Sequence, residues 1–505
     1  MKNLYTLLES RFPKAKNTCA VETLDGRYYT FDDLRAGSAR MANWIASLNL
    51  PAGSRVAVQV EKSVEAVMLY LATLRSGMVF LPLNTAYREG EISYFLQDAE
   101  PAIVVCSPSN LNWIAPLAAA AGCQVVKTLG EEVNGSLLEA ATPFPDTFPT
   151  VACGARDLAA ILYTSGTTGR SKGAMLTHEN LTSNALTLQK VWRWQKGDVL
   201  LHALPIFHVH GLFVALHGAL VNGSKMLWLS RFEPDAVVGM LPRATVMMGV
   251  PTFYVRLLAD ARLDKNLVGH IRLFISGSAP LLAETFAEFK HRTGHAILER
   301  YGMSETVMLT SNPYDGERRA GTVGFALPGV KLRLMGDSGK VIAFKKGVDS
   351  EIGGVEVKGP NIFIGYWRMP EKTKEEFTPE GWFKTGDVGR WDADGYLNLI
   401  GRSKDLIITG GYNVYPKEIE MLLDDMPGVE ESAVIGIPHP DFGEAVTAVV
   451  VPKPGVALNP EEMVAVIKKN IANFKVPKKI HVVDALPRNT MGKVQKNLLR
   501  EQFQK

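Results

Sequence analysis

A run of glycines and small hydroxyl residues that ends in a lysine is the strongest sign of chemistry in the sequence. The run is YTSGTTGRSKG, residues 163–173, and its candidate phosphate-binding residues are Thr164, Ser165, Gly166, Thr167, Thr168, Gly169 and Lys172. Glycine lets a backbone wrap tightly around a ligand, and successive N–H groups with Ser and Thr hydroxyls form a donor-lined cradle that suits a polyanion. The same composition also occurs in flexible surface linkers. Lys172 is followed by Gly173 rather than by Ser or Thr, so the run does not match the P-loop of ordinary NTPases.

Three further segments follow predicted strands and carry polar or glycine residues. They are FHVHG at 207–211, SGSAP at 276–280 and RYGMSET at 300–306. In open α/β sheets, ligands bind beyond the carboxyl ends of the strands, where these segments are expected. Taken singly, His208 and His210 could be core histidines, and Gly277 could be a strand-end turn. Their common placement after strands favours one ligand site formed by all four segments.

Glu305, in the last of these segments, places a carboxylate beside the predicted phosphate site. An anion next to phosphates is favourable only with a cation between them. Mg²⁺ is commonly held by one or two protein oxygens together with phosphates, so Glu305 predicts a magnesium site. A carboxylate that caps a helix is the alternative.

Two residues of the C-terminal part also stand in turns. Asp387 ends KTGD at 384–387, and Lys493 ends the stretch LPRNTMGK at 486–493. An Asp in a turn is commonly a turn residue, and a lone Lys commonly faces solvent. The Pro and Gly around Lys493 favour a functional lysine, because they would hold its ammonium in place.

The elements that must position these residues are predicted by hydrophobic spacing. Short apolar runs alternate with helical spacing, which indicates a parallel sheet covered by helices on both faces. Strands are expected at 55–60, 79–83, 102–106 and 158–162, and again at 199–205, 226–229, 245–250 and 273–276. Helices are expected over 209–221 and 281–292, and another should begin at Phe31 with an Asp cap. The proline-rich segment 143–149 predicts a linker into a second α/β unit.

After residue 353 the pattern changes to strands and turns, with a hairpin predicted at Asp394-Gly395. After the stretch GRSKD at 401–405, the order strand, helix, strand, strand, helix, strand, helix to the end of the chain predicts a small α+β domain. With 505 residues the chain is too long for one core. The expected fold class is α/β: a large N-terminal domain, residues 1–402, of stacked α/β subdomains plus a β-rich part, and a C-terminal domain, residues 403–505.

Composition excludes several other classes of protein. A content of 46% hydrophobic and 21% charged residues is typical of a soluble globular protein, and a net charge of +3 gives no basis for nucleic-acid binding. The 4 scattered cysteines predict reduced thiols rather than a disulfide framework or a zinc site. The N-terminal residues lack a signal or transit pattern, and histidines interrupt the most apolar segment, 205–221, so no membrane span is expected. These features favour a cytoplasmic enzyme and leave the oligomeric state open.

The 163–173 run resembles, nearly residue for residue, the phosphate-binding signature of the AMP-forming adenylating superfamily, which includes acyl-CoA synthetases, luciferases and peptide-synthetase adenylation domains. The resemblance extends from Phe31 to Lys493. It implies an acid–thiol ligase that forms an acyl-adenylate from a carboxylate and ATP, releases pyrophosphate, and then transfers the acyl group to CoA. ATP and CoA would be co-substrates and Mg²⁺ the cofactor.

The resemblance also implies roles for single residues. Thr164 and Glu305 would hold Mg²⁺, Asp387 would bind the ribose hydroxyls, and Arg402 would touch ribose or phosphate. Lys404 would be the hinge about which the C-terminal domain turns as a mobile lid, and Lys493 on that lid would bridge the carboxylate and the α-phosphate. Gly410 and Gly411 would leave room for the pantetheine chain of CoA. The catalytic residues would be Lys493, Glu305 and His208, and the remaining nucleotide-binding positions would be Gly277, Ser278, Ala279, Pro280, Arg300, Tyr301, Gly302, Met303 and Ser304.

Within the superfamily, the sequence is most similar to the malonyl-CoA synthetase group, through ERYGMSE at 299–305, TSNPYDGER at 310–318 and the stretch 410–420. Ser304 stands where that group usually has Thr, and the hydroxyl is kept. The residue at the position of Arg300 is small in relatives that take bulky acyl chains. A buried Arg there would be unpaired unless the substrate supplied a carboxylate, for which a guanidinium is well suited. Malonate, or methylmalonate, is therefore the expected acid, within fatty acid metabolism, and Arg256, His208 and Ser276 are further substrate-binding candidates.

Several alternatives remain open at this point. Arg300 could pair with Glu299 or with another acid outside the acyl pocket. The enzyme could activate another short or medium carboxylic acid, or it could load a carrier protein instead of free CoA. A non-catalytic nucleotide-binding protein of the same fold is disfavoured, because Lys493, Glu305 and the glycine-rich run are all present.

Overall fold

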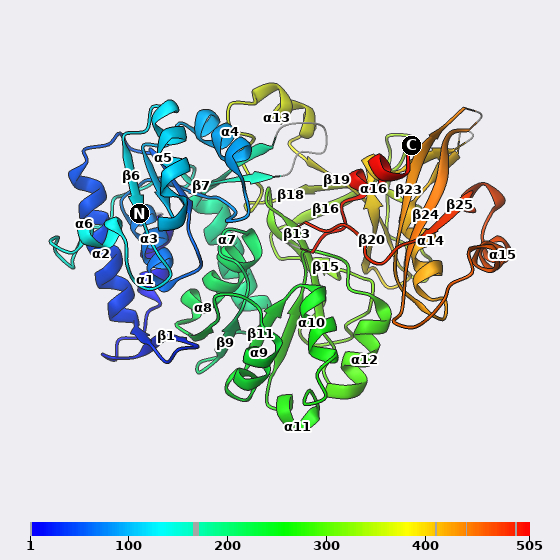
Figure 1. Cartoon of the computed structure of the whole chain (residues 1–505), viewed down its shortest axis with the longest axis horizontal. Helices are drawn as coiled ribbons and strands as arrows, with labels where there is room; N and C mark the ends of the chain where they lie inside the picture. The colour runs from blue at the N-terminus through cyan, green and yellow to red at the C-terminus, as the bar shows by residue number, and fades with distance from the viewer. Residues whose placement is uncertain (1–2, 165–170, 410–411, 441, 490–491, 505) are drawn as a thin grey trace. The chain divides into compact units, whose positions relative to one another are not determined.

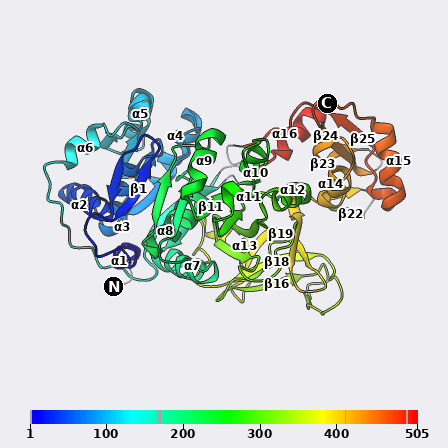
Figure 2. The ribbon, with the colours of Figure 1, turned by 90° about the horizontal axis from the view of Figure 1, so that it is seen from below.

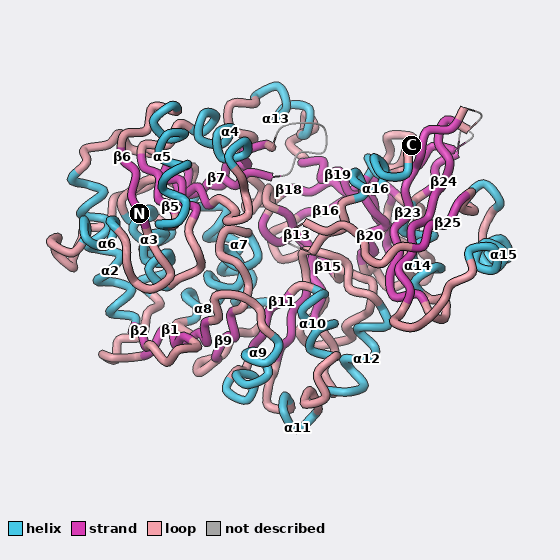
Figure 3. The backbone as a smooth tube through the Cα atoms, viewed as in Figure 1, coloured by secondary structure: helices cyan, strands magenta, loops and turns pink. Residues whose placement is uncertain are grey.

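Helices and strands alternate through the N-terminal half of the chain (Figures 1 and 3). The computed structural model describes residues 3–164, 171–409, 412–440, 442–489 and 492–504. The chain divides into two units: Met1–Ala320, Gly324–Lys331 and Lys358–Phe383 form the first, and Gly321–Val323, Leu332–Val357 and Lys384–Lys505 form the second. The mixed α/β class expected from the sequence is confirmed. The domain boundary expected between residues 402 and 403 stays a prediction.

The first sheet of the first unit has six strands in the order β6-β5-β3-β4-β7-β8, all parallel except for the β7–β8 pair. Its strands are β3 (Arg55–Gln59), β4 (Val79–Pro82), β5 (Ile103–Cys106), β6 (Val125–Thr128), β7 (Leu158–Thr164) and β8 (Lys172–Thr177). Helices α4 (Glu89–Ala99) and α5 (Leu111–Ala120) share a core with this sheet through residues such as Phe95 and Ile114. Continuous apolar strands are expected where a parallel sheet is covered in this way.

The second sheet has nine strands in the order β15-β14-β13-β12-β11-β9-β10-β1-β2. They are β1 (Cys19–Thr23), β2 (Tyr28–Thr30), β9 (Val199–His202), β10 (Lys225–Trp228), β11 (Val246–Gly249), β12 (Leu273–Ser276), β13 (Leu298–Met303), β14 (Val307–Ser311) and β15 (Phe325–Ala326). The strands from β13 to β1 in this order run parallel, so their carboxyl ends share one edge. Four helices gather on one face in both views and share its core: α9 (Pro234–Met240), α10 (Pro251–Leu258), α11 (Lys265–Val268) and α12 (Ala283–Thr293) (Figures 1 and 2).

The remaining helices of the first unit include one that is covered on all sides. Every residue of α3 (Val64–Arg75) is buried, which explains its apolar sequence. A π-helix, η2 (His210–Leu216), continues into α8 (His217–Asn222), where the sequence predicted one regular helix over 209–221. The others are α1 (Leu4–Ser10), α2 (Phe31–Ser47), η1 (Pro108–Asn110), α6 (Ser136–Ala141), α7 (His178–Val191), η3 (Leu241–Arg243) and α13 (Pro370–Glu376). No helix in the described part of the chain has both the length and the apolar character that crossing a membrane requires.

The second unit is built mainly from two further sheets. The first has the order β17-β16-β18-β19-β20, and the second has the order β22-β21-β24-β23 with β25 parallel to β24. The strands are β16 (Lys331–Met335), β17 (Val341–Ile342), β18 (Gly353–Lys358), β19 (Phe383–Trp391), β20 (Leu397–Arg402), β21 (Ile407–Thr409), β22 (Tyr412–Val414), β23 (Val429–His439), β24 (Gly443–Pro452) and β25 (Lys479–Val482). The helices are η4 (Ser403–Asp405), α14 (Pro416–Asp424), α15 (Pro460–Asn470), η5 (Asn473–Lys475) and α16 (Lys496–Phe503). The predicted hairpin at Gly395 joins β19 and β20, and the predicted C-terminal order holds apart from the added β22.

Two local predictions were wrong. The cap of α2 is Thr30, whose side chain accepts from the N–H of Asp33 while Asp33 closes the capping box, so no Asp occupies the cap position. The segment 143–149 does not lead into the second sheet, because the strand that follows it, β7, pairs with β4 in the first sheet. Conversely, β1 from the beginning of the chain pairs with β10 in the second sheet. Strand pairing is decided by which faces can be buried together, and chain order does not report it.

Candidate active site

Arg300, the third residue of β13, is a buried cation without an anionic partner in the described part of the chain. Arg300 is 4% exposed, and its Nε and Nη2 atoms have no hydrogen-bond partner among the residues that the structure describes. No ion pair joins Arg300 to Glu299 or to any other acid among the described residues. Burial lowers the pKa of the guanidinium to about 9, against a smaller opposite effect of Tyr254. An unpaired buried charge is costly, so this arrangement fits a site in which Arg300 binds an anionic group of a ligand.

Gly277 makes room for the Arg300 guanidinium. A Cβ atom added at Gly277 would lie 2.4 Å from both Cζ and Nη1 of Arg300. Ser276, which ends the adjacent parallel strand β12, is fully buried, and its Oγ also lacks a partner. Ser276 and Arg300 both lie at the carboxyl edge of the second sheet, where ligands bind in such folds. Because Ser276 pairs with Glu299 in the register, its side chain and that of Arg300 leave opposite faces of the sheet.

His210 joins this group from η2. It is fully buried, its Nδ1 lies 3.2 Å from Ser278 Oγ, and its Nε2 has no partner. Burial, and next the charge of Arg300, lower the pKa of His210 well below its usual range, so the ring is neutral. Ser278 has φ 74°, a backbone region that costs energy for a non-glycine residue and is commonly found at functional sites. The sequence pointed to the 207–211 segment but not to His210 as a site residue, since a core histidine explained it equally well.

The other two acyl-site candidates are less enclosed. His208 is half-buried, and its Nδ1 accepts from the N–H of His210 at 3.3 Å. Arg256 is exposed on α10, whereas Tyr254 two residues before it is buried and donates to the carbonyl of Ile275 at 2.6 Å. The roles of His208 and Arg256 stay predictions.

The residues that flank the glycine-rich run are paired across two strands. Thr164 and Lys172 are register partners on antiparallel β7 and β8, and Thr164 Oγ1 donates to the carbonyl of Lys172 at 3.5 Å. The Lys172 ammonium lies 4.4 Å from the ring centroid of Tyr366 and 3.5 Å from Glu376 Oε1. The predicted phosphate ligands between the two strands lie outside the described residues, and these are Ser165, Gly166, Thr167, Thr168 and Gly169.

Glu305 is connected to the same group of residues. It is 5% exposed, and its Oε1 accepts a 3.0 Å hydrogen bond from the Tyr366 hydroxyl. Residues 304–306 form the turn between β13 and β14, so Glu305 does not cap a helix. No motif signalled Tyr366, which contacts both Lys172 and Glu305. Within the described ranges, no group of three or more His, Cys, Asp or Glu side chains could hold a metal ion, so a magnesium site would need oxygens from other groups or from the ligand.

The remaining predicted nucleotide-binding positions of the first unit follow β12 and β13. Ala279 is half-buried and Pro280 exposed after β12, while Tyr301, Gly302 and Met303 end β13 and Ser304 begins the turn after it. A Cβ atom at Gly302 would lie 1.8 Å from the Val307 carbonyl oxygen, so only glycine fits there. These positions are in place for a ligand at the strand ends, and their contacts with nucleotide stay predictions.

The second unit carries the other predicted site residues. Asp387 on β19 is 7% exposed and its Oδ1 accepts from Arg402 Nε at 2.7 Å. Lys404 lies in η4 and is exposed. Lys493 is exposed and belongs to a turn in which its N–H donates to Asn489 Oδ1 and its carbonyl accepts from the N–H of Asn489, both at 2.9 Å. That these residues reach the first unit's site stays a prediction, and Gly410 and Gly411 lie outside the described residues.

These features describe an α/β ligand-binding enzyme fold with a C-terminal α+β domain, and comparison with known proteins identifies its family. The family model for AMP-binding enzymes matches residues 9–367, and the model for the C-terminal domain of AMP-binding enzymes matches residues 418–493. The chain belongs to the AMP-binding enzyme family.

Three individual relatives show which activities and structures occur among similar proteins. The chain is 33% identical to a malonate–CoA ligase of Arabidopsis thaliana, covering 99% of this chain and 89% of that protein. It is 34% identical to a feruloyl-CoA synthase of Amycolatopsis sp, covering 95% and 94%. The crystal structure of ATP-bound MatB from Rhodopseudomonas palustris is 56% identical and superimposes with a TM-score of 0.96, covering 100% of this chain and 99% of that one. Relatives at about one-third identity thus carry names with different acids.

Proposed function

We propose that the protein is an AMP-forming acid–CoA ligase that converts malonate to malonyl-CoA in two steps. Malonate would attack the α-phosphate of ATP to give malonyl-AMP and pyrophosphate, and the thiol of CoA would then displace AMP. The carrying observation is Arg300, a buried guanidinium packed against Gly277, whose Nε and Nη2 atoms have no hydrogen-bond partner among the described residues. The resemblance to a malonate–CoA ligase and to MatB supports the same assignment.

Recognition of the acid would use one carboxylate of malonate, leaving the other to react. A guanidinium offers two parallel N–H groups to a carboxylate, and the pairing would remove the cost of the isolated charge. The neutral His210 ring, which lies close enough to feel the charge of Arg300, adds a donor without adding charge. A monocarboxylic acid in this pocket would leave Arg300 unpaired, which disfavours ferulate and simple fatty acids.

Adenylation brings together two anions, so positioning and neutralisation of charge must supply the rate. Lys493 is proposed to bridge the attacking carboxylate and the α-phosphate, with Asp387 and Arg402 on the ribose side. Lys172 and the glycine-rich run would bind the departing phosphates. Glu305 and Thr164 would hold Mg²⁺, which when bound would neutralise phosphate charge, and the hard oxygen atoms of both side chains suit that ion.

The thiolysis step is proposed to use the same C-terminal domain in a second orientation, turned about Lys404, with Gly410 and Gly411 beside the pantetheine chain. The cytoplasm is the proposed compartment, and malonyl-CoA for fatty acid metabolism is the proposed product. All four cysteines are free, which fits a reducing compartment. Methylmalonate is the second acid to be considered.

The decisive experiment measures pyrophosphate release and thioester formation with ATP, Mg²⁺ and free CoA across malonate, methylmalonate, succinate, acetate and ferulate. Malonate is expected to give the highest kcat/KM, and a chelator should abolish pyrophosphate release. A preference for a monocarboxylic acid would refute the malonate assignment. Pyrophosphate release without any CoA thioester would instead favour an enzyme that loads a carrier protein.

Lys493→Ala separates the two half-reactions. Adenylation should be lost, whereas thioester formation from supplied malonyl-AMP and CoA should persist. Loss of both reactions in a folded variant would contradict the proposed role of Lys493, and so would retention of adenylation.

A further inference from the structure

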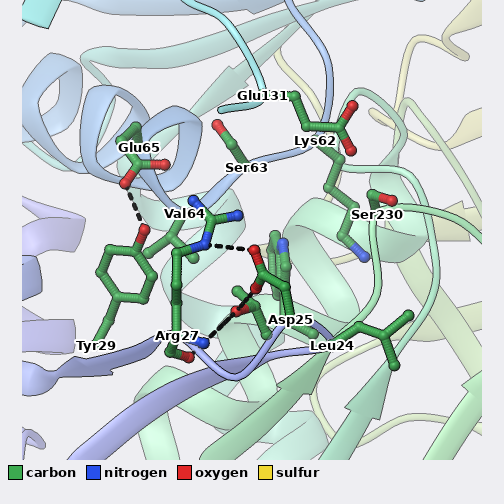
Figure 4. A pocket seen from close by; sticks show the side chains of 12 residues that line it. Leu24, Asp25, Arg27, Tyr29, Lys62, Ser63, Val64, Glu65, Glu131 and Ser230 are labelled. Atoms are coloured by element: carbon green, nitrogen blue, oxygen red, sulfur yellow. Dashed lines mark hydrogen bonds and ion pairs between the residues drawn. The ribbon is translucent and has the colours of Figure 1, made fainter. Parts of the chain in front are cut away.

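Lys62 is another buried cation of the first unit, and no carboxylate pairs with it among the described residues. It lies between β3 and α3, is 7% exposed, and lines a pocket of ≈ 280 Å³ together with Glu131 and Ser230. Figure 4 shows its ammonium turned away from the Glu131 carboxylate. The Lys62 ammonium therefore does not form an ion pair with Glu131, and other groups contact it.

Three acceptors surround the ammonium. Lys62 Nζ donates to the carbonyls of His202 at 2.8 Å and Leu229 at 2.6 Å, and lies 2.9 Å from His202 Nδ1. The Trp228 ring centroid is 4.2 Å away, so its face adds a cation–π contact. Burial lowers the pKa of Lys62 well below its usual range, but three acceptors match the three donors of an ammonium, whereas a neutral amine has only two. The arrangement therefore holds Lys62 charged.

The contact with Lys62 sets the tautomer of His202. His202 Nε2 lies 3.0 Å from the carbonyl oxygen of Gly211, which only accepts, so Nε2 carries the proton. Burial and the charge of Lys62 lower the pKa of His202 well below its usual range, which keeps the ring neutral. The other nitrogen, Nδ1, is then an acceptor and takes a hydrogen bond from Lys62. One tautomer satisfies both contacts at once.

His202 is thereby tied to the helix that carries His210. Gly211 is the second residue of the π-helix η2, directly after His210. A Cβ at Gly211 would lie 2.0 Å from the Pro205 carbonyl oxygen, so the backbone is tightly packed at this point. π-Helical turns are irregular and frequently occur at functional sites. Any displacement of Gly211 must move His210, whose Nδ1 lies 3.2 Å from Ser278 Oγ.

The geometry points to a positioning role for Lys62: through His202 and the Gly211 carbonyl, it orients η2 and the His210 donor of the acyl site. This inference rests on the proposed malonate site. Lys62 follows β3 of the first sheet, while His202 ends β9 and Leu229 follows β10 of the second. The ammonium therefore joins the carboxyl edges of both sheets within one unit. Lys62 itself would not touch the substrate.

The test compares Lys62→Met with Lys225→Met, a matched loss of a lysine charge at the other end of β10. Lys225 pairs with Glu22, which keeps Arg243 as a second partner when Lys225 is removed. Lys62→Met is expected to raise the KM for malonate about tenfold, the scale of second-layer effects in other sites, while the KM for ATP and the kcat change less than about twofold. Lys225→Met should leave all three unchanged. A malonate KM equal to wild type in folded Lys62→Met would overturn the inference.

A double-mutant cycle tests whether the effect passes through His202. In a His202→Gln background, Lys62→Met should raise the malonate KM by less than about twofold more, because both substitutions break the same series of contacts from Lys62 through His202 to Gly211. If the effects of the two substitutions on KM simply multiply, Lys62 does not act through His202.

A measurement on the wild-type protein does not depend on how the variants fold. In protein labelled with ¹⁵N-histidine and assigned with His202→Gln, His202 Nδ1 should show the resonance of an unprotonated acceptor nitrogen. A protonated Nδ1 would overturn the inference. Failure of wild-type enzyme to make malonyl-CoA would instead refute the proposed function, and the His202 resonance would still report on the Lys62 contact.

Discussion

Arg300→Met should lower malonate activity and stabilise the free enzyme at the same time. Methionine keeps much of the length of the arginine side chain but removes its charge and its donors. The proposed function requires Arg300 for binding the second carboxylate, whereas the fold gains nothing visible from it, since Nε and Nη2 lack partners. A residue kept only for packing would not produce this combination of effects.

The structure gives the size of both effects. Burial lowers the pKa of Arg300 from the ordinary value of a guanidinium to about 9, and at 1.36 kcal/mol per pH unit this puts the cost of holding the buried charge at no more than about 5 kcal/mol. Replacing buried charges by apolar groups has gained about 1–4 kcal/mol in other proteins, and a gain of that order is expected here. Removing one partner of a buried charge pair costs about 2–5 kcal/mol, so kcat/KM for malonate should fall roughly 30- to 5,000-fold.

The assay pairs steady-state kinetics with unfolding. Malonate-dependent pyrophosphate release gives kcat/KM, titration with ATP gives nucleotide affinity, and urea unfolding of the ligand-free enzyme gives stability. ATP affinity should change less than about twofold, and acetate should lose far less activity than malonate. Arg300→Lys, which keeps the charge but loses the fork of donors, should recover only part of the malonate activity.

Arg318→Met is the matched control for stability. The Arg318 guanidinium donates to the carbonyls of Pro313, Ala296 and Tyr314 at 3.3, 2.8 and 3.0 Å. Its loss would leave three acceptors without these donors, so Arg318→Met should destabilise the enzyme. If Arg300→Met kept wild-type preference for malonate, Arg300 would not be the carboxylate receptor. If it destabilised the enzyme as much as Arg318→Met, the claim of an unpartnered charge would be wrong.

Three further predictions follow from the same structure. Gly277→Ala should displace the Arg300 guanidinium, because the new Cβ would lie 2.4 Å from it. The KM for malonate should rise at least about tenfold, and unchanged malonate kinetics would contradict the contact. His178 is buried, burial lowers its pKa to about 4, and its Nδ1 accepts from the N–H of Leu4 at 3.0 Å. Its neutral form therefore stabilises the fold above pH 6.5, and the free energy of unfolding should fall by about 3 kcal/mol as the pH falls from 6.5 to 4. Urea unfolding of His178→Asn should show a correspondingly weaker pH dependence over that range. An unaltered dependence would exclude His178 as the cause. Burial raises the pKa of Asp424 to about 6, so its ionised form costs stability as the pH rises from 3.8 to 6. Asp424→Asn should therefore raise the free energy of unfolding at pH 7.5 by about 1–3 kcal/mol, with the gain shrinking at pH 4.5, and an equal gain at both pH values would refute this reading of Asp424.

Local hydrophobic pattern predicted most elements because the physical signal is local. The strand expected at 273–276 is β12 to the residue, and the helix expected at 281–292 differs from α12 by two residues at its start and one at its end. The pairing of strands was not predicted. β1 joins the second sheet and β7 the first, since a strand's apolar run is equally compatible with either neighbour. The π-helix η2 was also missed, because its apolar residues fit a regular helix equally well.

The candidate site was predicted in part for the same reason. The order and composition of the four segments after strands placed Ser276 and Arg300 near the ligand, and both lie at the carboxyl edge of the second sheet. Tyr366 carried no signal, because its contact with Glu305 joins residues 61 positions apart. His210 was ambiguous, since burial of a histidine and its partners depend on packing that no spacing reports.

The sequence by itself determined the family and the class of ligand. The glycine- and hydroxyl-rich run before Lys172 indicates phosphate binding from the sequence alone, because such a site uses the backbone and side chains of consecutive residues. Only the tertiary structure decided that Arg300 has no anionic partner among the described residues, and that Lys62 meets His202 and Leu229, 140 and 167 residues away. The net charge of a buried pocket is the sum over residues from distant parts of the chain, so it is settled when the sheets pack and not before.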